Sequence, residues 1–215
     1  MTIGMPRIDR LPAQERGLTI GDFLVPIRVS ERMHVRARHV ALILAGTLLI
    51  ALCARVEILV PGIPVPFTGQ TFGVLLAAGA LGFKRGLAAS ALYLLLGTIG
   101  IPVFAGGASG SAWLLGATGG YLVGFVIASA IVGRLAELGW DRNVFGAVGA
   151  MVVGSLAIYA IGVPWLAVSA FGGDLQQGVA KGMVPFLIWD GVKLALAAVA
   201  FPAAWWVVGR RPGDR

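Results

Sequence analysis

Long apolar stretches, separated by short breaks, dominate this chain from His39 to Val208. The breaks contain prolines, glycines or a few charged residues, which end helices or turn the backbone. About 20 apolar residues are needed for a helix to cross a bilayer. The pattern predicts an all-α integral membrane protein, a bundle of six transmembrane helices over 39–60, 67–83, 86–101, 112–133, 144–168 and 182–208. The second and third stretches are short for a full crossing, so we expect these helices to be tilted, broken or sheltered within the bundle.

The few charged residues gather at the ends of the chain and at the ends of the apolar stretches. Only 13% of the residues are charged, whereas soluble domains carry about 25%. If both termini are cytoplasmic, fourteen Lys and Arg residues lie inside and two, Arg55 and Lys181, lie outside. This is the bias of proteins in the cytoplasmic membrane. We therefore predict a basic cytoplasmic arm over 1–37, poorly ordered except where it leads into the first helix, a membrane domain over 38–209, and a cytoplasmic tail over 210–215.

Several classes of function are disfavoured by the same sequence. The net charge of +7 does not indicate nucleic-acid binding, because the basic residues flank apolar stretches instead of forming a stripe on one folded face. Cys53 is the single cysteine, so we expect no disulfide within the chain, and no metal site or cofactor is indicated. The sequence contains no Gly-x-x-x-x-Gly-Lys-Ser/Thr motif. Any ATP-driven process would therefore need ATPases on other subunits.

The most prominent polar feature is a charged pair inside the last apolar stretch. Asp190 and Lys193 are three residues apart, so they share one face of a helix. A charge in hydrocarbon costs at least ~2.5 kcal/mol, so such a pair must face a partner or a polar cavity. The spacing leaves two interpretations open: a structural ion pair that neutralises itself, or a ligand site. Trp189 is a candidate aromatic wall for a ring-shaped ligand.

Two uncharged segments supply further candidates. Thr68 and Gln70 lie just after a proline-rich loop, at the start of the second stretch. Thr68 fits either a helix cap or a ligand contact, and Gln70 offers both a donor and an acceptor. Gly106 and Gly107 end a loop without charge, in which glycine lets the backbone approach a ligand or serves as a plain connection.

Small residues recur at helical spacing on two of the predicted helices. Ala41 and Ala45 are four residues apart on the first helix, and Gly116, Gly120 and Gly124 line one face of the fourth. Small residues allow helix backbones to approach closely. Each face fits packing within the bundle or contact with a partner helix.

Four segments together resemble the BioY family, the biotin-binding subunits of energy-coupling-factor (ECF) transporters. The resemblance runs in consistent order from about residue 40 to residue 208, and the arm lies outside it. The segments are Val-Pro-Phe-Thr-Gly-Gln-Thr-Phe at 65–72, Tyr-Leu-Leu-Leu-Gly-Thr-Ile-Gly-Ile-Pro-Val-Phe-Ala-Gly-Gly at 93–107, Gly-Ala-Thr-Gly-Gly-Tyr-Leu-Val-Gly-Phe at 116–125, and Pro185 with Asp190 and Lys193.

The resemblance implies a six-helix bundle that binds biotin near the outer surface, with Asp190 and Lys193 at the ligand. Lys193 can donate to the ureido carbonyl or to the carboxylate of biotin, and Asp190 can accept from a ureido N–H or hold Lys193; the sequence leaves both open. Some members carry Asn where this chain has Gly106, so that contact is not transferred. We expect the apolar body of the ligand to pack on Tyr93, Phe104 and Trp189.

The resemblance also implies partners. The small residues Ala41 and Ala45 would contact a transmembrane coupling subunit, which assembles with two ABC-type ATPase subunits; self-association is the alternative. Three other functions remain open at this stage: an uptake subunit for another vitamin, an intramembrane enzyme that uses Asp190, and an assembly subunit without a ligand. The enzyme is disfavoured because no nucleophile–base pair or metal triad accompanies Asp190, so we assign no catalytic residue.

Overall fold

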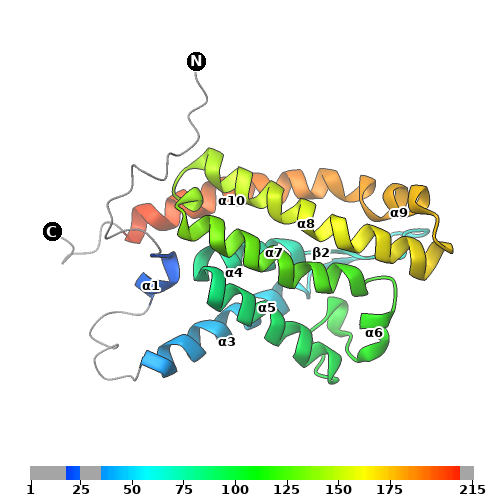
Figure 1. Cartoon of the computed structure of the whole chain (residues 1–215), viewed down its shortest axis with the longest axis horizontal. Helices are drawn as coiled ribbons and strands as arrows, with labels where there is room; N and C mark the ends of the chain where they lie inside the picture. Colours follow the sequence, from blue (N-terminus) through cyan, green and yellow to red (C-terminus); the bar gives the residue numbers. More distant parts are fainter. Residues whose placement is uncertain (1–17, 25–34, 209–215) are drawn as a thin grey trace, which may run out of the picture.

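The computed structural model describes residues 18–24 and 35–208. Within these ranges, helices of twelve or more residues occur in each of the six predicted stretches. Figure 1 shows the long helices running side by side along one axis. They are α3 (Val35–Cys53), α4 (Gln70–Leu81), α5 (Phe83–Thr98), α7 (Gly119–Glu137), α8 (Val144–Phe171) and α10 (Leu187–Val208).

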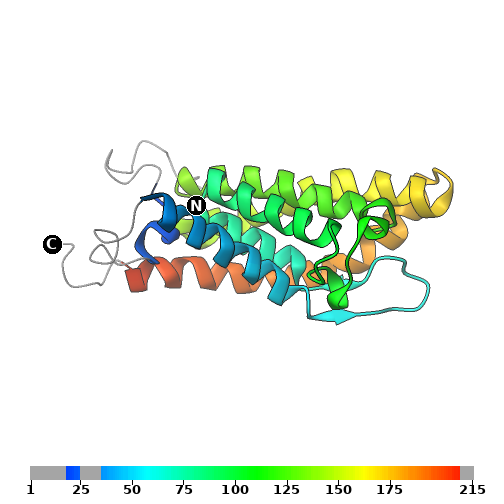
Figure 2. The same cartoon turned by 90° about the horizontal axis from the view of Figure 1, so that it is seen from below.

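Short elements connect the long helices. A two-stranded antiparallel hairpin pairs Glu57 with Thr68 and Ile58 with Phe67. It lies at the same end of the bundle as α6 and α9, which we call the hairpin end; α1 and the last turn of α10 lie at the opposite, terminal end (Figures 1 and 2). The short elements are α1 (Ile20–Leu24), β1 (Glu57–Ile58), β2 (Phe67–Thr68), α6 (Ser111–Leu115), α9 (Leu175–Gly182) and the 3-10 turns η3 (Ala105–Gly107), η4 (Trp140–Arg142) and η5 (Val184–Phe186).

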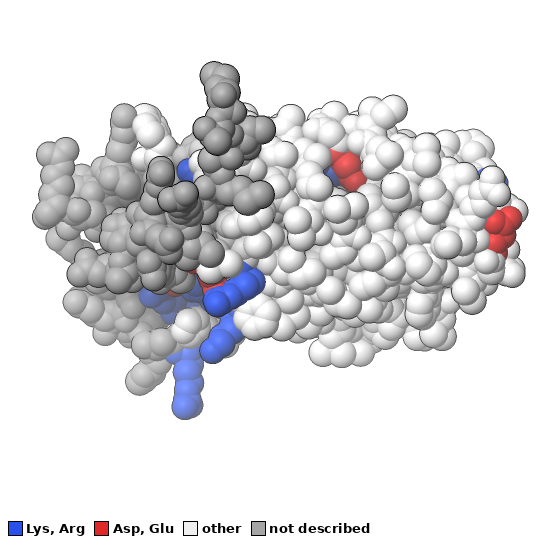
Figure 3. All heavy atoms as spheres, turned by 45° about the horizontal axis from the view of Figure 1, so that its top comes forward, with Lys and Arg blue, Asp and Glu red and all other residues white. Residues whose placement is uncertain are grey.

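The described helices confirm a membrane protein with several crossings. Four segments are long and apolar enough to span a bilayer: Arg36–Cys53, Gly119–Glu137, Val144–Phe171 and Leu175–Trp206. Helix α4 is apolar but shorter. Figure 3 shows charged residues gathered towards the terminal end and a few at the opposite end, with one small charged patch in an otherwise uncharged middle. A crossing by each of the six helices, and the side on which the termini lie, stay predictions.

The fourth predicted stretch is broken where a continuous helix was expected. Residue Gly116 ends α6 in an extended conformation, and α7 begins only at Gly119. The indole N–H of Trp165 donates to the carbonyl of Gly116 at 2.9 Å, which holds the break in place. The prediction that Gly116 shares a helix face with Gly120 and Gly124 is therefore wrong.

The other two glycines lie where α7 meets α8, its most extensive helix contact. A Cβ on Gly124 would stand 3.1 Å from backbone atoms of Ile158, and one on Gly120 would stand 2.3 Å from Trp165 Cβ. These distances leave no room for a side chain, so the two helices pack almost backbone to backbone. The glycines of α7 thus serve packing within the bundle.

Residues 18–24 dock on the terminal end of the bundle, although the arm was expected to be poorly ordered there. Thr19 and Ile20 are buried, and the Phe23 ring lies edge-on to Trp205 of α10, with centroids 5.8 Å apart. The carboxylate of Asp22 receives two hydrogen bonds from Arg85 of α5, at 2.8 and 3.0 Å. We call residues 18–24 the N-terminal clasp. The rest of the arm before Val35 and the tail from 209 lie outside the described residues.

Candidate functional site

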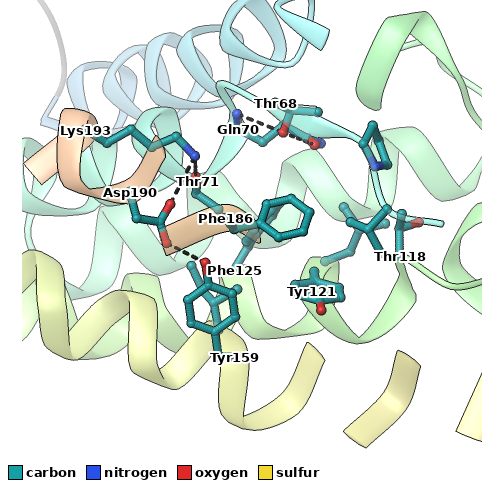
Figure 4. Close-up of a pocket in the computed structure, with 14 residues that line it drawn as sticks. Thr68, Gln70, Thr71, Thr118, Tyr121, Phe125, Tyr159, Phe186, Asp190 and Lys193 are labelled. Atoms are coloured by element: carbon teal, nitrogen blue, oxygen red, sulfur yellow. Dashed lines mark hydrogen bonds and ion pairs between the residues drawn. The ribbon is translucent and has the colours of Figure 1, made fainter. Parts of the chain in front are cut away.

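A cavity opens beside the β1–β2 hairpin, between β2, α4, α7, α8 and α10 (Figure 4). The space within it is about 490 Å³, including the part open to solvent. Aromatic and aliphatic side chains form most of its walls, and polar groups stand at separate places in the lining. Such a mixture suits a ligand with an apolar body and polar ends.

A charged cluster forms one side of this cavity. The Lys193 ammonium lies 3.3 Å from Asp190 Oδ1, so the predicted pair exists, one turn apart on α10. Lys193 also donates to the Thr71 hydroxyl of α4 at 2.5 Å. The Tyr159 hydroxyl of α8 donates to Asp190 Oδ2, also at 2.5 Å. Three helices therefore meet at one carboxylate and one ammonium group (Figure 4).

The cluster retains hydrogen-bonding capacity for a ligand. An ammonium group has three N–H donors, and two of those on Lys193 are engaged by Asp190 and Thr71. The carboxylate can accept about four bonds, and the structure fills two of them, from Lys193 and Tyr159. The side chains of Asp190 and Lys193 are 11% and 20% exposed. The two interpretations of the spacing are thus compatible, because the ion pair is real and it lines a cavity.

A second polar group stands at the start of α4. Thr68 donates to Gln70 Oε1 at 2.8 Å, and Gln70 Nε2 donates to the Tyr93 hydroxyl at 2.6 Å. Both Thr68 and Gln70 line the cavity, and their contact with a ligand stays a prediction. The backbone N–H of Gln70 also donates to the Thr68 hydroxyl at 3.3 Å. The N-cap of α4 is Gly69, however, so Thr68 is not the cap of this helix. The amide of Gln70 is held at both ends and presents a fixed face to the cavity.

Tyr93 and Phe104 pack behind Gln70, on the side away from the cavity. Each is 1% exposed, and their rings meet edge-on with centroids 5.6 Å apart. Neither is among the residues that line the cavity. A Cβ on Gly97 would stand 2.1 Å from the Phe104 ring, so the loop that carries Phe104 is pressed against α5. In this structure the two rings lie behind the lining residues, and their contact with the ligand stays a prediction.

The glycine-rich loop packs on the hairpin region and not on the cavity. The Gly106 N–H donates to Ala54 O at 3.2 Å, and a Cβ on Gly106 would stand 2.1 Å from a Glu57 oxygen. Gly107 faces Arg55 in the same way. Both glycines have positive φ, at 59° and 89°, which favours glycine. Close backbone approach is thus confirmed as their property, but the groups they approach belong to the chain itself.

Trp189 does not line the cavity, and it is 46% exposed. Adjacent helical residues point about 100° apart, so a Trp next to an inward-facing Asp190 turns away. The aromatic wall comes instead from Phe186, which stacks on Phe67 at 4.2 Å between centroids. Phe186 stands four residues before Asp190, the spacing that places two side chains on one face.

Sequence reasoning missed several lining residues. Thr71 directly follows the predicted Gln70, and its polar side chain in an apolar stretch could have indicated a lining residue. Tyr121, Phe125 and Tyr159 lie in apolar stretches of α7 and α8, where a buried tyrosine hydroxyl needs a partner that the sequence does not name. Tyr121 donates to the Gly182 carbonyl at 2.8 Å. Among residues 18–24 and 35–208, no three His, Cys, Asp or Glu side chains lie together as a metal site would require.

The small residues of the first helix face outwards. Ala41 and Ala45 are exposed on α3, and their neighbours Val40, Leu44 and Leu48 are each more than half exposed. Packing of these two alanines inside the bundle, one of the two interpretations, is therefore wrong. The face is free for lipid or for a partner helix.

Comparison with known proteins identifies the family of this chain. The family model described as "BioY family" matches residues 28–210. The chain belongs to the BioY family. The "Biotin transporter BioY" of Thermotoga maritima is 40% identical over 158 residues, covering 74% of this chain and 91% of that protein. The "Probable biotin transporter BioY" of Pyrococcus horikoshii is 38% identical over 165 residues, covering 77% and 94%.

One solved structure has a similar fold. It is described as the S-component for biotin from an ECF-type ABC transporter, and it is 27% identical in sequence. The superposition gives a TM-score of 0.71 and covers 78% of this chain and 90% of that one. The family match begins at residue 28, so the N-terminal clasp lies outside it.

Proposed function

We propose that this protein is the biotin-binding subunit of a vitamin-uptake transporter, and that it acts in the cytoplasmic membrane. Membership of the BioY family and the names of its relatives support biotin as the ligand. The observation that carries the proposal is the cluster of Asp190 and Lys193 on the wall of an otherwise largely apolar cavity. This subunit binds the vitamin, and partner subunits hydrolyse ATP.

The chemistry of biotin suits this cavity. Its fused rings carry a ureido group with one carbonyl acceptor and two N–H donors, and its tail ends in a carboxylate. The charged cluster and the Thr68–Gln70 pair each offer donors and acceptors. Phe186 and Phe125 supply apolar surface between them (Figure 4).

The exposed face of α3 supports contact with partner subunits. We propose that Ala41 and Ala45 contact a transmembrane coupling subunit, which joins this chain to two ABC-type ATPases. Self-association through the same face is the alternative. We further propose that the six long helices all cross the membrane with both termini in the cytoplasm. A reporter fused after Arg215 would then read as cytoplasmic, and one inserted within 172–174 would read as external.

Equilibrium binding of labelled biotin to the purified full-length protein tests the proposal. We expect saturable binding with a nanomolar dissociation constant, and recovery of the ligand unchanged. Thiamine and riboflavin at equal concentration are expected not to compete. Absence of saturation at micromolar biotin would refute the function, and chemical conversion of the ligand would indicate an enzyme.

A further inference from the structure

The two carboxylate oxygens of Asp190 accept hydrogen bonds from two different helices, α10 and α8. Lys193, on the same helix, approaches Oδ1 at 3.3 Å. Tyr159, on α8, donates to Oδ2 at 2.5 Å. Within the described part of the chain, Tyr159 is the only hydrogen-bond donor to Asp190 from another helix. The phenol therefore fixes the plane of a carboxylate that would otherwise be tied only to its own helix.

The same bond decides how the Lys193 ammonium is shared. Because Tyr159 already donates to Oδ2, Lys193 is not the single donor to the Asp190 carboxylate. The ammonium can therefore also donate to the Thr71 hydroxyl, at 2.5 Å. Without the Tyr159 hydroxyl, Asp190 would have Lys193 as its single donor, and the shortest way to satisfy the carboxylate would be to draw the ammonium towards it. The third N–H of Lys193 and the free lone pairs of Asp190 would then lose their fixed directions.

We propose that Tyr159 is a positioning residue of the ligand site. It holds Asp190 in the orientation in which Asp190 and Lys193 together present a donor and an acceptor to the cavity. This inference rests on the proposed function. It assigns to α8 a role in ligand recognition, because Asp190 and Lys193 lie on one helix and cannot by themselves fix the Asp190 carboxylate relative to the other helices. Tyr159 acts through Asp190, whichever polar end of the ligand the cluster receives.

The test compares two tyrosine-to-phenylalanine variants of the full-length protein, with labelled biotin as the probe. Tyr159→Phe removes the bond to Asp190. Tyr121→Phe removes the same atom from the same cavity, but its hydroxyl bonds the Gly182 carbonyl. Because a hydrogen bond to a charged group is the stronger kind, we expect Tyr159→Phe to weaken binding about 10- to 100-fold. The loss for Tyr121→Phe is expected to be about tenfold smaller.

A second measurement separates positioning from packing. In the Asp190→Asn background the acceptor is neutral, so Tyr159→Phe should cost less than about threefold in biotin affinity. A phenol that only fills space would cost the same in both backgrounds. The positioning role of Tyr159 would be overturned if Tyr159→Phe weakened biotin binding equally in the wild-type and Asp190→Asn backgrounds. It would also be overturned if Tyr159→Phe and Tyr121→Phe weakened binding equally. In both cases biotin binding by the wild type would still uphold the proposed function. Should wild type itself not bind biotin, the proposed function fails and this inference fails with it.

Discussion

The N-terminal clasp is expected to stabilise the bundle through Asp22. Its carboxylate accepts from both terminal nitrogens of Arg85, at 2.8 and 3.0 Å, and from the Thr19 backbone and hydroxyl, at 3.0 and 3.1 Å. Arg38 of α3 donates to the Asp22 carbonyl at 2.5 Å. The clasp thus connects α3, α5 and, through Phe23, α10. We predict that Asp22→Asn loosens all of these contacts together.

The magnitude follows from the burial of the pair. The side chains of Asp22 and Arg85 are 24% and 13% exposed. A fully exposed ion pair contributes about 0–1 kcal/mol, and breaking a buried one costs about 3–5 kcal/mol. A partly buried bidentate pair lies between, at about 2 kcal/mol. For a chain of this length that loss corresponds to about 4–8 °C in the apparent melting temperature.

The pH dependence supplies a sharper signature. Burial alone would raise the pKa of Asp22, but the hydrogen bonds and charge of Arg85 and the hydrogen bonds from Thr19 outweigh it, so the pKa is lowered from 3.8. A lowered carboxyl pKa stabilises the folded state above the unfolded pKa, and the contribution is lost as the pH falls through the folded pKa. The advantage of wild type over Asp22→Asn should therefore be constant from pH 8 to pH 6 and shrink below about pH 4.

Thermal unfolding of the purified protein in detergent, followed by tryptophan fluorescence, measures this difference. Arg134→Gln is the matched control, because Arg134 forms an ion pair with Glu137 but is 64% exposed. It should shift the melting temperature by less than about 2 °C. If Asp22→Asn shifts it no more than Arg134→Gln does, or if removal of residues 1–24 leaves it unchanged, the clasp does not stabilise the bundle and the reasoning is refuted.

Three further predictions concern the site, the exposed face of α3 and a buried carboxylate. Lys193→Met and Asp190→Asn should each weaken biotin binding, by about 3–5 and 1–3 kcal/mol; a double variant that recovers wild-type affinity in the same assay would show a purely structural pair. Ala45→Trp should leave biotin affinity within about twofold but reduce biotin uptake by cells that contain the partner subunits, since a bulky side chain holds a neighbouring helix away; loss of binding itself would contradict the outward position. Burial raises the pKa of Asp141 to about 6, partly offset by a hydrogen bond from Trp205. Because a raised carboxyl pKa weakens the folded state as the pH rises through that value, Asp141→Asn should stabilise the protein by about 1–3 kcal/mol at pH 7.5 and much less at pH 4.5, measured by thermal unfolding; an unchanged difference across this range would contradict the burial argument.

The helices and the charged pair could be predicted from the sequence because their signals are local. Apolar length and breaks locate the six long helices, and the three-residue spacing of Asp190 and Lys193 places both on one helix face. The break at Gly116 could not be predicted, because a tryptophan some fifty positions further along the chain holds it. Likewise, Tyr159 and Thr71 reach the charged pair from other helices. Such contacts depend on the rotation of each helix in the bundle, which sequence spacing alone does not fix.

The clasp was missed for a different reason. Residues 18–24 contain three aliphatic residues and one aromatic, too few for a periodic signal. Their order comes from the groups they meet on α5 and α10, chiefly Arg85 and Trp205. The sequence alone marks Arg85 as one of the basic residues between apolar stretches, where such residues fix orientation. Its side chain also organises the segment that precedes the bundle.

The position of α10 has a consequence for biogenesis. The ribosome makes α10 after the other described helices, so a nascent chain ending before residue 187 carries the Tyr159 and Thr71 side of the site but neither member of the charged pair. Since Asp190 and Lys193 lie within one helical turn, they neutralise each other while α10 inserts, before any other helix has contacted it. If the proposed site binds the vitamin, binding would require α10 to dock against α8, so the ability to bind would report the insertion of α10.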